Sequence, residues 1–247
     1  SRATNLAAKG ATPLAAVDCL NGGNPETPAV YGGFSAVVDG LADMCSDLSA
    51  PVVGGNVSLY NDSAAGPIPP TPTLAMVGTK PGYDAPTAAL DGDGALRLVG
   101  PGSDALGGSE LLAQAGGIDR FLTLPDDPAA VVEALAAVAD ADGTLAVHDV
   151  SNGGLAVTLA ELVTAEAGAD VAVDDSVALF EVTPGRAVVE TTDPEGVRAA
   201  FDGVAPVTRL GTATDDGVLS VDVDGTELTV DAERVAALRG VLDEALD

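Results

Sequence analysis

The chain has 247 residues, of which 47% are hydrophobic, and it carries a formal net charge of -28 at pH 7. So acidic a surface stays in solution where salt screens its self-repulsion, which indicates adaptation to a very salty, halophilic cytoplasm, and the apolar content argues against a disordered chain. Because the sequence has no basic patch, no apolar run of about 18 residues and no basic-then-apolar start, we expect no nucleic-acid partner, no membrane span, no signal peptide and a cytoplasmic location.

The first predicted elements are the end of a helix, closed by Gly10, and a short strand from Leu14 to Val17. Asp18 is expected at the end of that strand, before a turn-rich stretch that begins with Asn21. Acidic and amide side chains at this position are where open α/β sheets bind ligands. The alternative is that Asp18 and Asn21 only cap turns.

The next predicted element is a helix with one apolar face. Its stripe has spacings of four, three, four and three residues and consists of Phe34, Val38, Leu41, Cys45 and Leu48. Cys45 is therefore expected in the core, and Cys19 lacks the flanking pattern of a nucleophile. With His148 as the one histidine, neither a His-rich zinc site nor a Cys/His amidase is expected. If the reaction consumes ammonia, another polypeptide would therefore have to release it.

The most informative stretch begins with the apolar strand Pro51–Val53. Gly54 and Gly55 follow and are expected to turn the chain sharply and to admit a ligand to the backbone. Extended alternation then places Asn56, Ser58 and Tyr60 on one face. Hard oxygen ligands beside bare backbone suit a phosphorylated ligand with Mg²⁺. The alternative is a tight bend with Asn56 capping the turn.

Residues 80–94 are rich in Pro, Gly and Asp without a sustained period, and they predict a boundary between two domains, 1–84 and 95–247. A strand is predicted before this boundary, from Thr73 to Gly78. After it strands and helices alternate, which predicts an α/β architecture.

The second domain contains two further candidate sites. The turn Gly107-Gly108-Ser109 opens a helix and could hold an anion on free backbone N–H groups, or Ser109 could simply cap the helix. After the helix 128–141 and the strand 145–147, His148 and Asp149 precede two glycines and another helix, an order typical of phosphate or metal sites. A lone histidine is more often structural, and Asp149 could instead cap the helix.

The remainder is predicted to be scaffold. The expected elements are a strand at 187–190, a helix at 194–201, a strand at 207–210, a hairpin of 218–223 with 227–230 about Asp224-Gly225, and a last helix at 232–246.

Five stretches together carry a family resemblance. They are DCLNGGNP from Asp18, PVVGGNVSLYN from Pro51, IPPTP from Ile68, LGGSE from Leu106 and HDVSNGGL from His148. In this order they resemble the synthetase subunit of phosphoribosylformylglycinamidine synthase, from about Ala3 to the C-terminus. Related enzymes share the His-Asp-x-Ser-x-Gly-Gly pattern but lack the GGNVSLYN and IPPTP stretches.

The resemblance implies an α/β (α+β) fold, namely a two-domain repeat of the aminoimidazole ribonucleotide synthetase-like type, truncated at its N-terminus. It implies a ligase that forms a carbon–nitrogen bond with glutamine-derived ammonia. The reaction is the ATP-dependent amidation of formylglycinamide ribonucleotide in de novo purine biosynthesis, with ATP and Mg²⁺ as cofactors. Phosphorylation activates the amide oxygen, and ammonia displaces the phosphate.

By the family pattern, Asp18 and Gly55 contact the nucleotide, Asn56 is a Mg²⁺ ligand and Ser58 contacts the substrate. Only analogy with the other repeat of the family suggests roles for Gly107, Gly108, Ser109, His148 and Asp149. No catalytic residue is implied here, because the family's catalytic histidine belongs to the first repeat. Asn152 stands where an aspartate is usual.

The implied partners are the missing first repeat, a glutaminase subunit, a small accessory subunit and the ribonucleotide. The isolated chain is expected to be inactive, and its exposed sheet could pair in a homodimer. The alternatives are an aminoimidazole ribonucleotide synthetase-like cyclo-ligase and a non-catalytic half-subunit that binds ADP and Mg²⁺.

Overall fold

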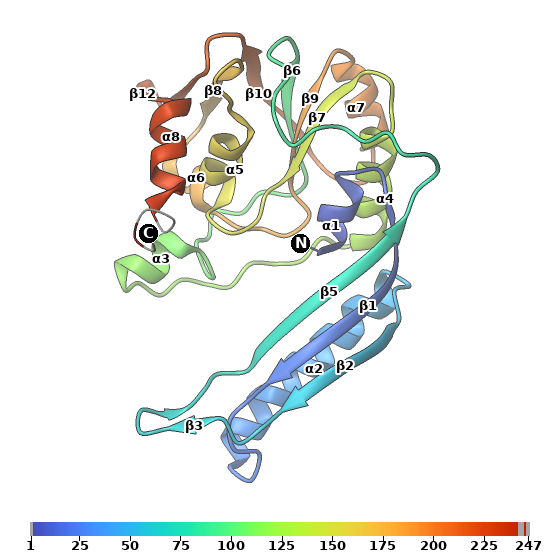
Figure 1. Cartoon of the computed structure of the whole chain (residues 1–247), viewed down its shortest axis with the longest axis vertical. Helices are drawn as coiled ribbons and strands as arrows, with labels where there is room; N and C mark the ends of the chain where they lie inside the picture. Colours follow the sequence, from blue (N-terminus) through green and yellow to red (C-terminus); the bar gives the residue numbers. More distant parts are fainter. Residues whose placement is uncertain (1, 242–244, 246–247) are drawn as a thin grey trace. The chain divides into compact units, whose positions relative to one another are not determined.

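The computed structural model describes residues 2–241 and 245, and the chain forms two compact units. The smaller unit contains residues 11–81, and the larger contains residues 3–10 and 82–247 (Figure 1). The division at 81/82 lies within the expected interdomain stretch, residues 80–94. Residues 3–10, which the sequence assigns to the first domain, lie in the larger unit.

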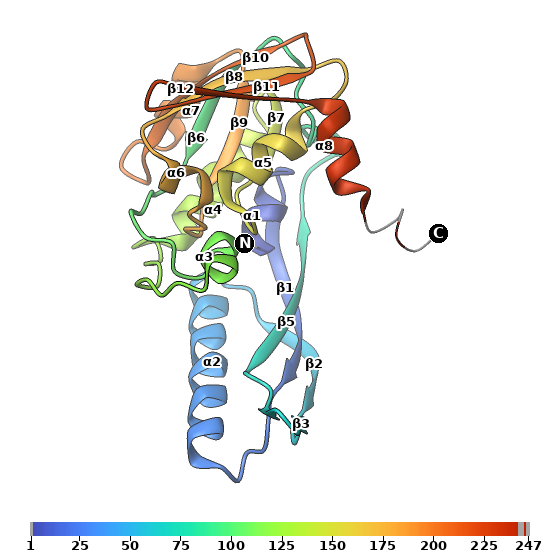
Figure 2. The same ribbon diagram turned by 90° about the vertical axis from the view of Figure 1, so that its left-hand side faces the viewer.

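The smaller unit is a three-stranded sheet with one long helix, α2 (Pro28–Asp47), along one face (Figure 2). The strand order is β2-β1-β5, with β1 parallel to β2 and antiparallel to β5. The strands of the unit are β1 (Thr12–Asn21), β2 (Val52–Ser58), β5 (Thr71–Thr79) and the short hairpin β3 (Asp62–Ser63) with β4 (Gly66–Pro67). Proline in the first turn of α2 fits the helix start, because its missing N–H would be unpaired there anyway.

Two expectations about these strands are wrong. Asp18 does not end its strand, since β1 continues to Asn21. Gly54 and Gly55 do not form a turn, because β2 runs through both in extended conformation. The expected helix carrying Cys45 is present as α2, and the strand expected from Thr73 to Gly78 is present as β5.

The smaller unit has a very small core. Among residues 11–81 the buried apolar side chains are Ala11, Ala16, Cys45 and Ala50. The sheet face turned away from α2, which we call the open face, carries Val17 (44% exposed) and Val77 (60% exposed). Few buried side chains and an apolar uncovered face mean that this unit gains little stability from its own packing.

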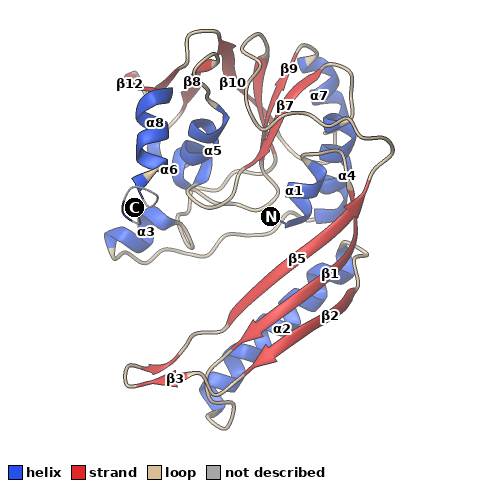
Figure 3. Cartoon of the chain, in the orientation of Figure 1, coloured by secondary structure: helices blue, strands red, loops and turns tan. Residues whose placement is uncertain are grey.

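The larger unit is built on a seven-stranded sheet of order β12-β11-β8-β10-β6-β9-β7 (Figure 3). The pair β8 and β11 is parallel, and all other neighbours in the sheet are antiparallel. The strands are β6 (Ala95–Val99), β7 (Thr144–Asp149), β8 (Gly168–Val173), β9 (Ala187–Thr191), β10 (Val207–Thr214), β11 (Val218–Val223) and β12 (Thr226–Asp231). The helices are α1 (Arg2–Ala7), α3 (Glu110–Ala115), α4 (Pro128–Ala139), α5 (Gly154–Leu162), α6 (Ser176–Phe180), α7 (Pro194–Ala200) and α8 (Ala232–Arg239).

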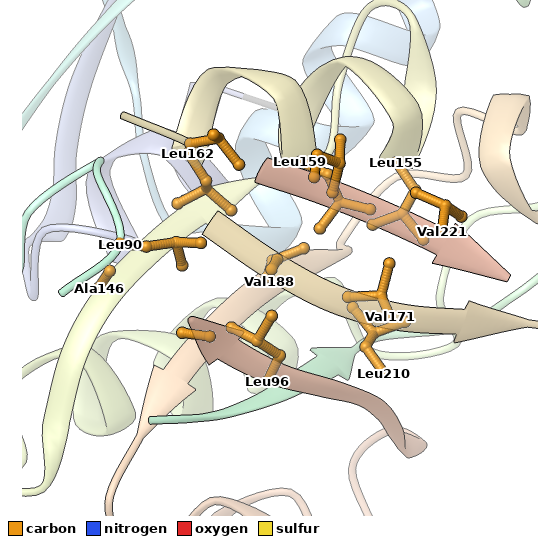
Figure 4. Close-up of a cluster of buried hydrophobic side chains, with 14 of the residues drawn as sticks. Leu90, Leu96, Ala146, Leu155, Leu159, Leu162, Val171, Val188, Leu210 and Val221 are labelled. Carbon is orange, nitrogen blue, oxygen red and sulfur yellow. The ribbon is translucent and has the colours of Figure 1, made fainter. Parts of the chain in front are cut away.

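The core of the larger unit lies between α5 and the sheet. Figure 4 shows Leu155, Leu159 and Leu162 of α5 above side chains from several strands, among them Val171 and Val188. The leucines follow a spacing of three and four, which places them on one side of the helix. The buried stripe predicted for α4 is also confirmed: Val131, Val132, Leu135 and Val138 are all buried.

Buried polar groups hold the loops of the larger unit to its sheet. Glu190, with 0% exposure, accepts hydrogen bonds from the backbone N–H groups of residues 91–94. Arg186 and Glu181, both buried, form an ion pair at 3.0 Å. Burial lowers the pKa of Arg186, and the charge of Glu181 partly offsets that effect.

The predicted last helix is present as α8, which ends at Arg239. Part of its predicted C-terminal half, including Leu242, lies outside the described residues. Within the described part of the chain, no helix combines the length and the apolar character that a membrane span needs.

Candidate functional site

The register between β1 and β2 determines where the predicted site residues point. Asp18 pairs with Gly55, Cys19 with Asn56, and Asn21 with Ser58. Successive side chains in a strand point to opposite faces, and paired residues share a face. The open face therefore carries Cys19, Asn21, Asn56 and Ser58, whereas Asp18 points to the face covered by α2.

The position of Asp18 explains why residue 55 is a glycine. A Cβ atom at Gly55 would overlap with Oδ1 of Asp18 and would lie 2.7 Å from the Asp18 carbonyl oxygen. A Cβ atom at Gly54 would meet no atom within 4 Å. On the same face, burial and secondarily the charge of Asp18 raise the pKa of the Cys45 thiol, which places the carboxylate beside α2.

On the open face the polar side chains form a short network. The Nδ2 groups of Asn21 and Asn56 donate to Sγ of Cys19 at 3.7 Å and 4.0 Å. Asn56 is exposed and Ser58 is half-buried. Asn61 closes the network, since its Nδ2 donates to the carbonyl oxygens of Ser58 at 2.9 Å and of Gly22 at 3.0 Å.

Cys19 and Asn61 are contributions that sequence reasoning missed. Alternation along β2 alone groups Asn56 with Ser58. Pairing β1 with β2 in parallel register would have added Cys19 and Asn21 to the same face. Asn61 lies beyond the strand, so no periodicity could have indicated its role.

The donor set fits a magnesium nucleotide better than a bare metal ion. Among the described residues, no group of three His, Cys, Asp or Glu side chains is arranged to hold a metal ion. Between residues 11 and 81 the only basic side chain is Lys80. A phosphate here would need a divalent cation for charge neutralisation, and Mg²⁺ commonly takes few protein ligands besides phosphate and water oxygens.

The turn at Gly107, Gly108 and Ser109 is accounted for by packing alone. Ser109, 3% exposed, caps α3 by accepting the N–H of Leu112 at 3.2 Å. A Cβ atom at Gly107 would overlap with the carbonyl oxygen of Arg120, and Gly108 has a positive φ of 84°. These observations agree with the helix-cap alternative.

His148 and Asp149 lie at the end of β7 in a group of polar contacts. Asp149, 6% exposed, accepts a hydrogen bond from Nδ2 of Asn5 at 2.7 Å. Burial raises the pKa of Asp149, although the neighbouring His148 acts in the opposite direction. The ring of His148 lies 2.8 Å from the Asp149 carbonyl oxygen through Nδ1 and 3.4 Å from Glu161 through Nε2. Asp149 does not cap α5, whose N-cap is Gly153.

The candidate residues thus fall into separate groups. Asp18, Gly55, Asn56 and Ser58 lie on two paired strands of the smaller unit, though on two faces of the sheet. The residues around Ser109 and Asp149 belong to the larger unit, where local contacts satisfy them.

Comparison with protein families gives two matches. Residues 2–79 match the family described as AIR synthase related protein, N-terminal domain, and residues 95–224 match AIR synthase related protein, C-terminal domain. The second match alone covers more than half of the chain.

Curated relatives are similar along nearly the whole chain. A "Phosphoribosylformylglycinamidine synthase subunit PurL" of Haloquadratum walsbyi is 64% identical over 99% of this chain, and one of Natronomonas pharaonis is 65% identical over 99%. A PurL subunit of Methanosarcina acetivorans is 36% identical over 96%. The chain spans 35% of the length of each of these relatives.

Solved structures share the fold. Thermotoga maritima PurL complexed with FGAR superposes with a TM-score of 0.71 at 17% identity, over 93% of this chain and 40% of that one. Escherichia coli HypE, a hydrogenase maturation protein, superposes with a TM-score of 0.72 at 18% identity, over 95% of this chain and 79% of that one.

Proposed function

The chain belongs to the AIR synthase related family, and from this premise we propose that it is part of a phosphoribosylformylglycinamidine synthase. The proposed reaction is the ATP-dependent amidation of formylglycinamide ribonucleotide by ammonia. The observation that carries the proposal is the identity of 64% to a PurL subunit over 99% of the chain. If the chain shared only the fold of the family, we would not expect so high a sequence identity to one kind of member.

The proposed roles on the open face follow from its donor atoms. Asn56 offers a carboxamide oxygen to the Mg²⁺ of the nucleotide, and Ser58 offers a hydroxyl group to the substrate one alternate position further along β2. When bound, Mg²⁺ would neutralise phosphate charge, which no lysine or arginine of residues 11–79 can do.

Asp18 does not share the open face with Asn56 and Ser58, so its proposed role, together with that of Gly55, is a different one. The Asp18 carboxylate occupies the space over Gly55 on the α2 side of the sheet. From there it fixes the backbone of β2, and the backbone of Gly55, which is exposed, remains open to the nucleotide. Asp18 would then contact the nucleotide only if that ligand reached around the edge strand β2.

The chemistry divides between this chain and its partners. The amide oxygen of the substrate takes the terminal phosphoryl group of ATP, and ADP is released. Ammonia then adds to the activated carbon and loses a proton, and the carbon–oxygen bond breaks as phosphate leaves with that oxygen. Binding and orientation of nucleotide and substrate are the parts proposed for this chain. A first repeat would supply the remaining groups, and glutaminase and accessory subunits would supply ammonia.

The open face is the proposed contact with that first repeat. Its valines are exposed although the unit buries few apolar side chains, so covering the face would stabilise the unit. In the isolated chain, the open face of a second copy would take the place of the first repeat, which would give a homodimer.

The test compares two proteins in an assay for amidine formation from ammonia, ATP and the ribonucleotide. We expect no turnover by the 247-residue chain alone and turnover by a longer protein that also contains the first repeat. Asn56→Ala in the longer protein should raise the Mg²⁺ requirement, and Ser58→Ala should raise the KM for the ribonucleotide. Turnover by the isolated chain would overturn the proposal. The proposal would also be wrong if the longer protein bound the substrate of an aminoimidazole ribonucleotide synthetase in preference to formylglycinamide ribonucleotide.

A further inference from the structure

The side chain between the two asparagines of the open face is a cysteine. Cys19 lies on the central strand β1, paired with Asn56 on β2 and followed two residues later by Asn21 on the same face. Its Sγ accepts the Nδ2 groups of both asparagines, at 3.7 Å and 4.0 Å. One sulfur atom therefore contacts two carboxamides that come from different strands.

These contacts determine how the carboxamides are turned. When Nδ2 faces the sulfur, Oδ1 of the same group points away from it, because the two atoms lie on opposite sides of the amide carbon. Neither Oδ1 accepts a hydrogen bond from the residues that the structure describes. The open face therefore presents two carboxamide oxygens with free acceptor capacity, on neighbouring strands.

Sulfur suits this task chemically. A hydroxyl or carboxylate at residue 19 would itself be a hard oxygen ligand and would compete for Mg²⁺. A thiol is soft, so it binds Mg²⁺ poorly, yet it remains a weak hydrogen-bond acceptor. It can orient the carboxamides without joining the coordination sphere.

We propose that Cys19 is a positioning residue that holds both carboxamides with their oxygens outward, and that Asn21 is a second oxygen donor beside Asn56 for the cation of the bound nucleotide. This inference rests on the proposed function, since it assumes that Asn56 binds the metal. It adds to that function one donor and the residue that orients the pair.

The test measures the binding of Mn²⁺ in the presence of ATP by electron paramagnetic resonance. The protein is the longer one, which contains this chain together with the first repeat. Cys19→Val keeps the size of the side chain and removes the acceptor, whereas Cys19→Ser keeps an acceptor. We expect Cys19→Val and Asn21→Ala each to weaken Mn²⁺ binding about tenfold, as is typical for groups that support a metal ligand. Cys19→Ser should weaken it by less than Cys19→Val does.

The control is Thr73→Val. Thr73 is the partner of Cys19 on β5, so it lies on the same face at the same level, but the described hydrogen bonds of the two carboxamides go to Cys19 and not to Thr73. This variant should bind Mn²⁺ as the unmodified protein does. Hydrogen exchange of the β1 and β2 amides identifies any variant that fails to fold, and Cys19→Ala then replaces Cys19→Val.

The outcomes separate the inference from its premise. If Asn56→Ala weakens Mn²⁺ binding but Cys19→Val, Cys19→Ala and Asn21→Ala do not, the inference is overturned and the proposed function stands. If Asn56→Ala has no effect either, the metal role of the open face is wrong.

Discussion

Neighbouring glycines at positions 54 and 55 differ in what they do for the structure. Both lie in β2, and neither has the positive φ that would require glycine. Only Gly55 lies against Asp18, so only there does the absence of a side chain matter for packing. The sequence indicated that this pair was special, but it could not indicate which glycine was needed, because that depends on the register with β1.

This difference gives a matched pair of variants. Gly55→Ala must displace the Asp18 side chain or the strand, and we expect it to cost about 1–3 kcal/mol in the free energy of unfolding of the smaller unit. Gly54→Ala should change that free energy by no more than about 0.5 kcal/mol. Hydrogen exchange of the β1 and β2 amides measures both, and equal effects would contradict the prediction.

The carboxyl group of Asp149 is buried, and its pKa is raised as a result. Because burial raises its pKa, the folded protein binds this proton more tightly than the unfolded chain does. Its contribution to stability is therefore greatest at low pH and is lost as the pH rises from about 3.9, the ordinary value, through the raised pKa of the folded state.

Asp149→Asn cannot lose a proton, so it should lack this pH dependence. We expect the free energy of unfolding of the unmodified protein minus that of Asp149→Asn to fall as the pH rises from about 4 to about 7. Urea titrations at constant salt measure the difference. Asp202→Asn, at an exposed position, removes the same formal charge and serves as the control. A constant difference for Asp149→Asn would contradict the prediction.

At the scale of elements, β9 is attached to the loop that precedes β6 through one side chain. The Glu190 carboxylate accepts four backbone N–H groups, from Asp91 at 2.7 Å and from the next three residues at 3.0, 3.2 and 3.1 Å. The sequence presented this loop as an unstructured boundary. Glycines and aspartates without a period indicate a loop, but they do not reveal that a strand almost a hundred residues later binds it.

Glu190→Gln tests this attachment. Whichever way the new carboxamide turns, its NH₂ group faces at least one backbone N–H that has lost its acceptor, and an unpaired buried donor costs about 1–3 kcal/mol. We expect that loss in global unfolding, together with faster hydrogen exchange at residues 91–94. Glu195→Gln is the control, because Glu195 pairs with Arg198 on the surface and exposed ion pairs contribute little. Equal losses in the two variants would contradict the role of Glu190.

Elements with a strong local signal were predicted, and those that depend on distant partners were not. The hairpin of β11 and β12 was predicted from Asp224-Gly225, and both residues have positive φ values, of 50° and 81°. The strand β8 and the short helix α6 were not predicted. β8 lies in the interior of the sheet, between β10 and β11, and its parallel partner β11 lies far along the chain.

At the scale of the whole molecule, the family resemblance predicted the two-domain fold better than any local pattern. The acidic composition predicted a salty environment, and the similarity to proteins of Haloquadratum walsbyi and Natronomonas pharaonis is consistent with that prediction. What neither could predict was the asymmetry between the units, with one extensive core and one very small core. Buried fraction depends on tertiary packing, which the apolar content of each half does not determine.

The net charge of -28 predicts a strong dependence of stability on salt. Screening lengths fall from about 8 Å at 0.15 M to about 3 Å at 1 M salt, which weakens the repulsion among carboxylates. We expect the urea midpoint to rise with KCl over this range, first for amides of the smaller unit, as hydrogen exchange would resolve. Sucrose, which favours burial without screening charge, is the control. A midpoint independent of KCl would contradict the prediction.

The path of the chain between its units has a topological consequence. The larger unit begins with residues 3–10, and the chain returns to it at residue 82. Close to these two points in the sequence, Nζ of Lys9 donates a hydrogen bond to the carbonyl oxygen of Pro86 at 2.9 Å, and both residues belong to the larger unit. Within the described residues, the smaller unit therefore lies between two segments that belong to the larger unit, so a single cut within residues 11–81 leaves each fragment attached to the larger unit. Joining Gly10 to Gly82 through a short linker would excise the smaller unit and leave the sheet of the larger unit complete.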